Sequence, residues 1–398
     1  MTSKVTVPLL DLRAQYDTIK GQIDKAIQGV LETQRFIMGP EVSSLEEEIA
    51  SYCDARFAIG CASGSDAVLL AMMALDIGPG DEVICPTYTF FATAGSIARL
   101  GAVPVFADID PETYNVDLGS VRQAASRCKR LKAIMPVHLY GQTVDMSAYL
   151  ALGEELGVPI VEDAAQAIGS RDSDGKLAGS RGVIGCFSFF PSKNIGAYGD
   201  AGILTTNDAD LAERLSILRL HGSKPKYYHK IIGLNSRLDA LQAAILRVKL
   251  RHIAAWHEGR RENAEAYDGA FAAAGAATSA VPLTAGGFPL RTPQPPSGQA
   301  THIYNQYVIR VPGPMRDELR QHLQDQRIGT EIYYPVPLHM QECFAYLGYA
   351  QGDLGESESA ARETLALPIY PELTDQQLAH VTDTIVAYIG EHACATKA

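Results

Sequence analysis

The stretch Cys186-Phe-Ser-Phe-Phe-Pro-Ser-Lys-Asn194, followed by IGAYGDAG (195–202), decides the fold and points to the chemistry. Its apolar start, GCFSFF (185–190), predicts a short buried strand. Lys193 follows this strand and precedes a glycine-rich loop with few charges. A single lysine is usually a solvated surface group. Partial burial here would lower the pKa of Lys193, which a lysine that forms a Schiff base requires.

Short apolar segments and helical segments alternate on both sides of this stretch. The predicted strands are EVICP (82–86), VPVFADI (103–109), AIMPVHLYG (133–141), PIVEDA (159–164), GCFSFF and AGILTTN (201–207). The predicted helices are SDAVLLAMMAL (65–75), TFFATAGSIARLG (89–101), MSAYLALGEELG (146–157) and LAERLSILRLHG (211–222). This alternation predicts an α/β domain with a mainly parallel sheet. Ligands bind such sheets at the carboxyl ends of the strands.

The ends of the chain predict further helices and a second domain. Ser44-Leu-Glu-Glu47 and Thr374-Asp-Gln-Gln377 have the pattern of capping boxes, and residues 15–30 predict a helical lead-in. A long helical pattern over 237–275 is expected to link two domains. We predict a large α/β domain over residues 1–250 and a smaller α+β domain over 251–398.

Composition excludes several classes of protein. The chain has 398 residues and a formal net charge of −12, which argues against non-specific nucleic-acid binding. It has no signal-peptide pattern and no apolar run of roughly 18 residues, so we predict a cytoplasmic protein without membrane contact. The seven cysteines never form CxxC and predict free thiols rather than disulfides or a metal site. The motifs of zinc proteases, α/β-hydrolases and P-loop NTPases are absent.

Two further segments carry candidate site residues. Ala62-Ser-Gly-Ser-Asp66 opens a predicted helix, whose first N–H groups and dipole favour an anion. Ser65 or Asp66 is alternatively a simple N-cap. Asp163 follows an apolar strand and could contact a protonated ring nitrogen or a metal, or only cap the next turn. Together, a phosphate cradle, a carboxylate and a lysine in this order suit pyridoxal 5′-phosphate (PLP).

Four blocks resemble the DegT/StrS-type nucleotide-sugar aminotransferases, which are fold-type I PLP enzymes. The blocks are GPGDEVICPTYTFFAT, VEDAAQAIGS, FSFFPSKNIGAYGDAG and GLNSRLDALQAAIL, and the likeness covers essentially the whole chain. The resemblance implies a large domain with a mainly parallel, mixed seven-stranded sheet. It also implies a homodimer whose active sites lie at the subunit interface.

The resemblance assigns roles residue by residue. Lys193 would carry the cofactor, Asp163 would pair with the pyridine nitrogen, and Gln166 would neighbour the ring hydroxyl. The remaining cofactor contacts would be Phe90 stacked on the ring, Gly64, Ser65 and Ser188 at the phosphate, and Asn235 at the phosphate of the partner subunit's site. Because Lys193 is present where some relatives have histidine, transamination is favoured over dehydration.

The resemblance also implies a ping-pong reaction that moves an amino group from L-glutamate to a nucleotide-linked keto-sugar. The segment NSRLD (235–239) favours amination at sugar C3 over C4. Candidate substrate contacts are Arg237, Tyr334, His339 and His221, although Arg237 could be a helix-surface residue and Tyr334 and His339 could simply pack. His138 is expected to be structural.

Two other functions stay open. A relative could act on a non-nucleotide cyclic ketone, such as an aminocyclitol precursor, or make an amino-hydroxybenzoate. A nucleotide would need a basic or aromatic groove, for which the candidates are Lys224, Lys226, Tyr227 and Tyr228. A non-catalytic PLP-fold sensor is disfavoured, because the chain has no spare segment for a DNA-binding module and carries net negative charge.

Overall fold

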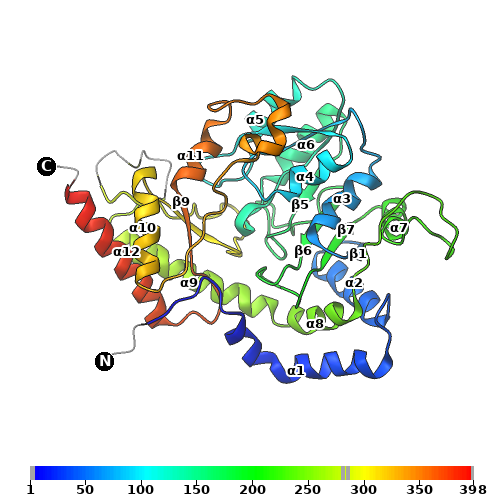
Figure 1. Ribbon diagram of the computed structural model, residues 1–398, viewed down its shortest axis with the longest axis horizontal. Helices are drawn as coiled ribbons and strands as arrows, with labels where there is room; N and C mark the ends of the chain where they lie inside the picture. Colours follow the sequence, from blue (N-terminus) through cyan, green and yellow to red (C-terminus); the bar gives the residue numbers. More distant parts are fainter. Residues whose placement is uncertain (1–4, 279–282, 284–286, 396–398) are drawn as a thin grey trace.

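A seven-stranded sheet forms the centre of the computed structural model, which describes residues 5–278, 283 and 287–395 (Figure 1). The strands are β1 (Phe57–Cys61), β2 (Glu82–Pro86), β3 (Val103–Ala107), β4 (Leu131–Ile134), β5 (Val161–Asp163), β6 (Ile184–Ser188) and β7 (Gly202–Thr206). They pair in the orders β1-β7-β6-β5 and β3-β2-β4. Parallel bridges from Ile134 to Ile160 and from Val137 to Asp163 join the two halves. Only β7 runs antiparallel to its neighbours, which confirms the mixed, mainly parallel sheet.

Helices cover both faces of the sheet, because successive strand residues point to opposite sides. On β7, Leu204 packs into one apolar core and Ile203 into another. The first face is covered by α3 (Gly64–Ala74), α4 (Ala92–Arg99) and α7 (Ala209–Leu218). The second face is covered by α2 (Pro40–Tyr52), α5 (Leu118–Ala125), α6 (Met146–Leu156) and α8 (Ala240–Leu250), with α1 (Leu12–Thr33) packed on α8. The architecture is therefore α/β, as predicted.

Two local predictions were wrong. The strand predicted over 133–141 ends at Ile134, shortly before Pro136, which has no N–H for a ladder, and residues 139–141 form a 3₁₀ turn. The capping box at Ser44 does not start a helix. Instead α2 begins at Pro40 after an N-cap at Gly39. Proline is well suited to the first helical position, because its missing N–H would have no intrahelical partner there.

The C-terminal part has its own apolar core, at the left of Figure 1. It is built from α9 (Ile253–Ala273), β8 (Tyr307–Arg310), α10 (Gly313–Asp325), β9 (Thr364–Leu367) and α12 (Asp375–Ala395), with α11 (Gly355–Glu363) ahead of β9. The predicted capping box is present, since Thr374 and Gln377 exchange side-chain to backbone hydrogen bonds of 3.1 and 3.2 Å. Val7 also packs in this core. The division between residues 250 and 251 stays a prediction.

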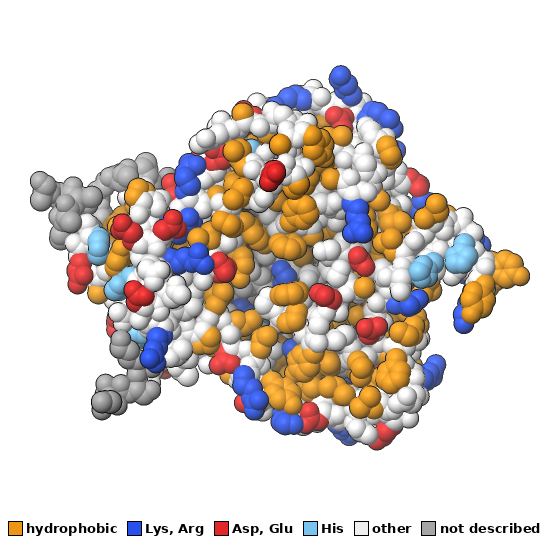
Figure 2. Space-filling view, in the orientation of Figure 1, with side chains coloured by type: hydrophobic (Ala, Val, Ile, Leu, Met, Phe, Trp, Pro, Cys, Tyr) orange, Lys and Arg blue, Asp and Glu red, His pale blue; other side chains and the backbone are white. Residues whose placement is uncertain are grey.

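The segment that follows α7 projects from the body at the right of Figure 1. Tyr227, Tyr228 and Ile232 are 79%, 70% and 91% exposed, and we call residues 222–232 the arm. Figure 2 shows hydrophobic, basic and histidine side chains gathered on this projection. Large apolar side chains exposed this far usually mark an interaction surface.

Other predictions concern cysteines and membranes. Cys53, Cys61, Cys85 and Cys186 are buried free thiols, and the side chain of Cys394 lies outside the described residues. Within the described part of the chain, no helix is long and apolar enough to cross a bilayer. No group of three or more potential metal ligands comes together there either.

Candidate active site

One cavity of about 430 Å³ opens at the carboxyl ends of the parallel strands. It is lined by eight of the predicted site residues, Gly64, Ser65, Phe90, Asp163, Gln166, Ser188, Lys193 and Tyr334. These residues come from segments up to 270 positions apart in the chain. The sheet brings them together because β1, β2, β5 and β6 all end at this edge.

The start of α3 forms one end of the cavity. Ser63 is the N-cap, and its hydroxyl accepts the N–H of Asp66 at 3.1 Å, so neither Ser65 nor Asp66 is the cap. The first intrahelical bond runs from Ala67 N–H to the Ser63 carbonyl. The N–H groups of Gly64 and Ser65 precede it, so the helix offers them no acceptor. They and the helix dipole make this end suitable for a phosphate.

Lys193 lies on the loop directly after β6, where its N–H donates to the Phe190 carbonyl at 2.9 Å. Lys193 is partly exposed and lines the cavity. Burial lowers the pKa of Lys193 to about 8, and the negative charge of Asp163 opposes that shift. A substantial fraction of the amine is therefore neutral near physiological pH, and a neutral amine is the nucleophilic and proton-accepting form.

Asp163 ends β5 and is only 4% exposed. Burial raises the pKa of its carboxyl group, and hydrogen bonds from Thr93 and from the Ala165 N–H act in the opposite direction. The Thr93 hydroxyl donates to Oδ2 at 2.7 Å and the Ala165 N–H donates to Oδ1 at 3.2 Å. The carboxylate is thus held by donors on both oxygens while still lining the cavity.

The amide of Gln166 has one orientation that satisfies its neighbours. Its Oε1 accepts the backbone N–H of Tyr140 at 2.6 Å, and its Nε2 donates to the Tyr334 hydroxyl at 3.3 Å. Because a backbone N–H can only donate, Oε1 must face Tyr140. The NH₂ group therefore faces Tyr334, which lines the cavity together with Gln166.

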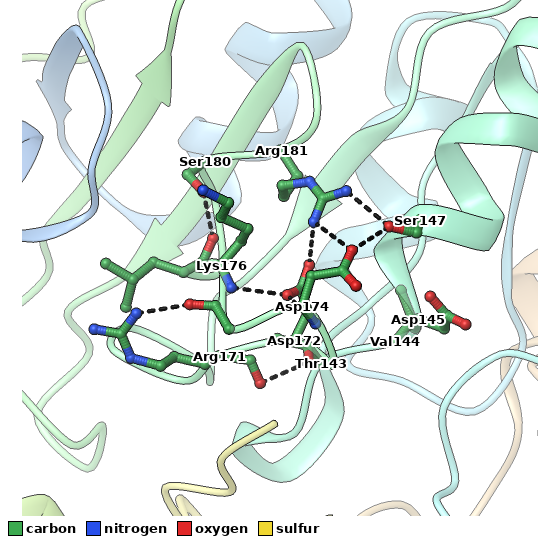
Figure 3. Close-up of polar contacts among 12 residues, drawn as sticks. Thr143, Val144, Asp145, Ser147, Arg171, Asp172, Asp174, Lys176, Ser180 and Arg181 are labelled. Carbon is green, nitrogen blue, oxygen red and sulfur yellow. Dashed lines mark hydrogen bonds and ion pairs between the residues drawn. The ribbon is translucent and has the colours of Figure 1, made fainter. Parts of the chain in front are cut away.

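The segment after Gln166 is fixed by a polar network at the surface (Figure 3). Arg181 donates to Asp172 at 2.7 Å, to Asp174 at 3.2 Å and to Ser147 at 2.9 Å. Asp172 is almost fully buried. Arg181 therefore ties the loop between β5 and β6 to the start of α6.

Four predicted residues lie outside the cavity of the single subunit. Asn235 and His221 are exposed beside the arm, and Arg237 is half-buried. His339 is 2% exposed and is bonded to the Thr87 hydroxyl at 2.8 Å.

His138 is buried and is not among the residues that line the cavity. Its Nε2 lies 2.9 Å from a carboxylate oxygen of Glu162, and its Nδ1 accepts the Val144 N–H at 3.3 Å. This geometry agrees with the structural role expected for His138.

The sequence pattern did not predict the two threonine hydroxyl groups near Asp163. Thr89 and Thr93 both line the cavity and their side-chain oxygens are 3.3 Å apart. A signal existed in TFFATAGS, where Thr93 lies at the start of the helix that follows β2. Nothing in the sequence indicated that this helix would face residue 163.

Comparisons with known proteins identify the family. Residues 17–386 match the model of the DegT/DnrJ/EryC1/StrS aminotransferase family. The chain belongs to this family. Because these aminotransferases are PLP-dependent, PLP is the cofactor of this aminotransferase.

Individual relatives match over almost their full length. The aminotransferase is 48% identical to a pleiotropic regulatory protein of Geobacillus stearothermophilus, over 96% of this chain and 99% of the relative. It is 42% identical to the UDP-N-acetyl-3-dehydro-alpha-D-glucosamine 3-aminotransferase of Acidithiobacillus ferrooxidans, over 97% and 98%. A crystal structure of S. venezuelae DesV in complex with a ketimine intermediate superimposes with a TM-score of 0.89 and 39% identity, covering 96% and 98%. The fold-type I architecture is thereby confirmed.

The residues of the cavity fit the cofactor. A Cβ atom at Gly64 would lie 2.5 Å from the Cβ of Ser188, so only glycine lets the start of α3 approach the end of β6 this closely at the end of the cavity. Lys193 offers an amine of lowered pKa and Asp163 a buried carboxylate. The 56% exposed ring of Phe90 offers an apolar face beside them.

Proposed function

We propose that this aminotransferase moves an amino group from L-glutamate to C3 of a nucleotide-linked keto-sugar by a ping-pong reaction. The observation that carries the chemistry is the convergence of Lys193, Asp163 and the start of α3 in one cavity. The 3-keto position is supported by the Acidithiobacillus relative, whose name specifies a 3-dehydro UDP-sugar. The segment NSRLD (235–239) favours the same position.

Each cavity residue receives a role from its chemistry. Bound PLP supplies a ring that accepts electrons when the donor loses its Cα proton. The Lys193 amine, neutral in part because its pKa is lowered to about 8, accepts and returns that proton. The Asp163 carboxylate accepts a hydrogen bond from the ring N–H and stabilises positive charge there. Both groups line the same cavity.

The other cavity residues bind and orient. The N–H groups of Gly64 and Ser65 and the hydroxyl of Ser188 are placed to hold the phosphate. The NH₂ group of Gln166 donates toward the ring hydroxyl. Phe90 would pack against the ring. Tyr334, whose ring centroid lies 6.2 Å from that of Phe90, would extend the apolar wall toward the sugar.

The charge of the cavity supports a homodimer. Among the described lining residues, Lys193 is the cation, while Asp163 and Asp200 are carboxylates. Phosphate, the donor carboxylate and a nucleotide diphosphate together require more positive charge than one committed lysine supplies. The arm carries Lys226, Lys230 and exposed aromatic rings. We propose that the arm, Asn235 and Arg237 of a second copy complete each site.

The half-reaction is the first test. PLP-loaded wild type mixed with L-glutamate should lose the visible absorbance of lysine-bound cofactor, and Lys193→Ala should not turn over. Recovery of the absorbance is then measured with UDP- and dTDP-linked 3-keto and 4-keto sugars and with a non-nucleotide cyclic ketone. Recovery with 3-keto sugars alone supports the proposal. Recovery only with the free cyclic ketone would favour the aminocyclitol or amino-hydroxybenzoate alternative.

A mixed dimer tests the shared site. Lys193→Ala and Asn235→Ala subunits carrying different tags are co-expressed and the hybrid is purified. If Asn235 serves the partner's cavity, one site of the hybrid is fully wild type and about half the wild-type activity returns. If Asn235 acts within its own subunit, both sites stay defective. Sedimentation of the wild type gives the oligomeric state independently.

A regulatory function is the second candidate, because one relative is named a pleiotropic regulatory protein. It would be favoured if PLP-loaded wild type binds the cofactor yet turns over no amino donor. The cytoplasmic location stays a prediction from the sequence.

A further inference from the structure

Thr93 makes a buried hydrogen bond to Asp163 that no role proposed above explains. Thr93 is 1% exposed, and its hydroxyl oxygen lies 2.7 Å from Asp163 Oδ2. The two residues are 70 positions apart and belong to α4 and β5. An ionised carboxylate can only accept hydrogen bonds, so the Thr93 hydroxyl donates to it.

Thr89 extends this contact into an oriented chain. Its side-chain oxygen lies 3.3 Å from that of Thr93, and it is 3% exposed. Because the Thr93 proton is committed to Asp163, Thr89 must be the donor in this second bond. Each bond in such a chain polarises the next, which strengthens the donor that reaches the carboxylate.

We propose that Thr93 is a positioning residue that keeps the Asp163 carboxylate ionised and turned toward the ring nitrogen of the cofactor. The inference rests on the role proposed for Asp163. Without the Thr93 donor, a rotation of the carboxyl group would turn its oxygens away from the ring N–H. Protonation would remove the negative charge that stabilises the protonated ring nitrogen. A protonated carboxyl group would instead present its own O–H to the ring.

The surroundings of Asp163 make this donor important. Burial raises the pKa of Asp163, and after Thr93 the opposing contributions come from the Ala165 N–H and from the positive charge of Lys193. The other titratable groups near the carboxylate are Cys85, Cys186 and Tyr334. All three are uncharged in their ordinary forms. Removing the Thr93 donor therefore moves the pKa of Asp163 further upward.

The test compares Thr93→Val, which replaces the hydroxyl by a methyl of similar size, with Thr93→Ser, which keeps the hydroxyl. Thr382→Val is the matched control, because Thr382 is buried on α12 and bonds only within its own helix. We expect Thr93→Val to lower kcat of the glutamate half-reaction roughly 10- to 100-fold with little change in KM. We expect Thr93→Ser to recover most of this loss.

Two readouts separate this role from simple packing. The acid limb of the kcat profile should move to higher pH in Thr93→Val, because Asp163 must be ionised. Thr93→Val should also weaken PLP binding, measured by equilibrium dialysis, more at pH 6 than at pH 8. If Thr93→Val fails to fold, Thr93→Ala provides the same loss of the hydroxyl with a smaller side chain.

Specific outcomes would overturn the proposal. A pH profile of Thr93→Val that matches Thr382→Val would show that the hydroxyl has no positioning role. Equal losses in Thr93→Ser and Thr93→Val would show the same. The variant Asp163→Asn distinguishes a failure of the proposed function from a failure of the role proposed for Thr93. If Asp163→Asn impairs the enzyme but Thr93→Val does not, the proposed function stands and only the role of Thr93 fails. If Asp163→Asn behaves as wild type, both fail.

Discussion

A Cβ atom at Gly64 would lie 2.5 Å from the Cβ atom of Ser188 and 3.0 Å from its Cα atom. Real Cβ contacts are longer, so the first turn of α3 approaches the end of β6 more closely than any other residue type allows. This approach places the N–H groups of α3 and the Ser188 hydroxyl at the same end of the cavity. The proposed phosphate site is therefore a consequence of backbone packing as much as of side-chain chemistry.

Gly64→Ala should weaken PLP binding at least tenfold and destabilise the unliganded enzyme by about 1–3 kcal/mol, because the helix start must move away from Ser188. Dialysis against PLP and urea unfolding measure the two effects. Gly29→Ala is the control, since a Cβ atom there meets nothing within 4 Å and should stabilise α1 by about 0.5–1 kcal/mol. Unchanged PLP affinity in Gly64→Ala would contradict the phosphate assignment.

The rate at which the unliganded enzyme attaches PLP should rise with pH around a midpoint of about 8, well below the ordinary lysine value of 10.5. The cause is burial, which disfavours the charged amine of Lys193. Because the charge of Asp163 raises this pKa, Asp163→Asn should move the midpoint to lower pH. Stopped-flow absorbance at several pH values measures both midpoints. A midpoint near 10 in the wild type would show that Lys193 is solvated.

Glu162→Gln should destabilise the protein by about 2–5 kcal/mol, as measured by urea unfolding at pH 7. The buried carboxylate accepts the N–H groups of Gly179, Arg181 and Gly182 and the ring N–H of His138, and an amide NH₂ would face some of these donors. Glu155→Gln makes the same change in an exposed ion pair and should alter stability by less than about 1 kcal/mol.

The Glu162 carboxyl group should also make the stability of the protein depend on pH. Burial opposes the ionisation of Glu162, but the hydrogen bonds outweigh it and hold the pKa below the ordinary value of 4.5. The stabilisation is therefore complete above pH 4.5 and is lost as the pH falls through the lower, folded-state pKa. Wild type should lose stability in this range, and Glu162→Gln should lack that part of the loss. If the free energy of unfolding of wild type and Glu162→Gln fell equally with pH in this range, the prediction for Glu162 would be wrong.

Arg181→Ala should destabilise the enzyme by about 1–3 kcal/mol, because it removes the charged partner of the buried Asp172 carboxylate (Figure 3). Thermal unfolding measures the change. Arg171→Ala removes an exposed guanidinium that donates to the Gly175 carbonyl, and it should lower the free energy of unfolding by less than about 1 kcal/mol. Equal effects of the two substitutions would show that the network does not depend on burial.

The sequence determined the α/β class and the main residues of the cavity. Strand and helix periodicities are local, so EVICP became β2 and SDAVLLAMMAL became most of α3. Strand ends were equally visible, which is why Asp163 and Lys193 could be singled out. All parallel strands end at one edge, so residues that follow them meet without further information.

Other features were decided only by the tertiary structure. The Thr93 hydroxyl meets Asp163, and the end of β6 closes on Gly64, because packing of α3 and α4 on the sheet sets those approaches. The segment YYPVPLH was predicted to bring both Tyr334 and His339 to the site. Of these two residues, Tyr334 lines the cavity, as does its neighbour Tyr333, whereas hydrogen bonds to Thr87 and Glu358 hold His339 outside it.

The features that the sequence determined differ from those that the tertiary structure decided in the range of the interactions behind them. Hydrophobic periodicity, proline and capping act within a few residues and can be recognised in the sequence. Even so, α2 begins at Pro40 and not at the capping box of Ser44. The environment of a site residue depends on which distant donors and apolar groups surround it. The lowered pKa of Lys193 and the donors on Asp163 thus belong to the folded chain, whereas the identity and order of these residues belong to the sequence.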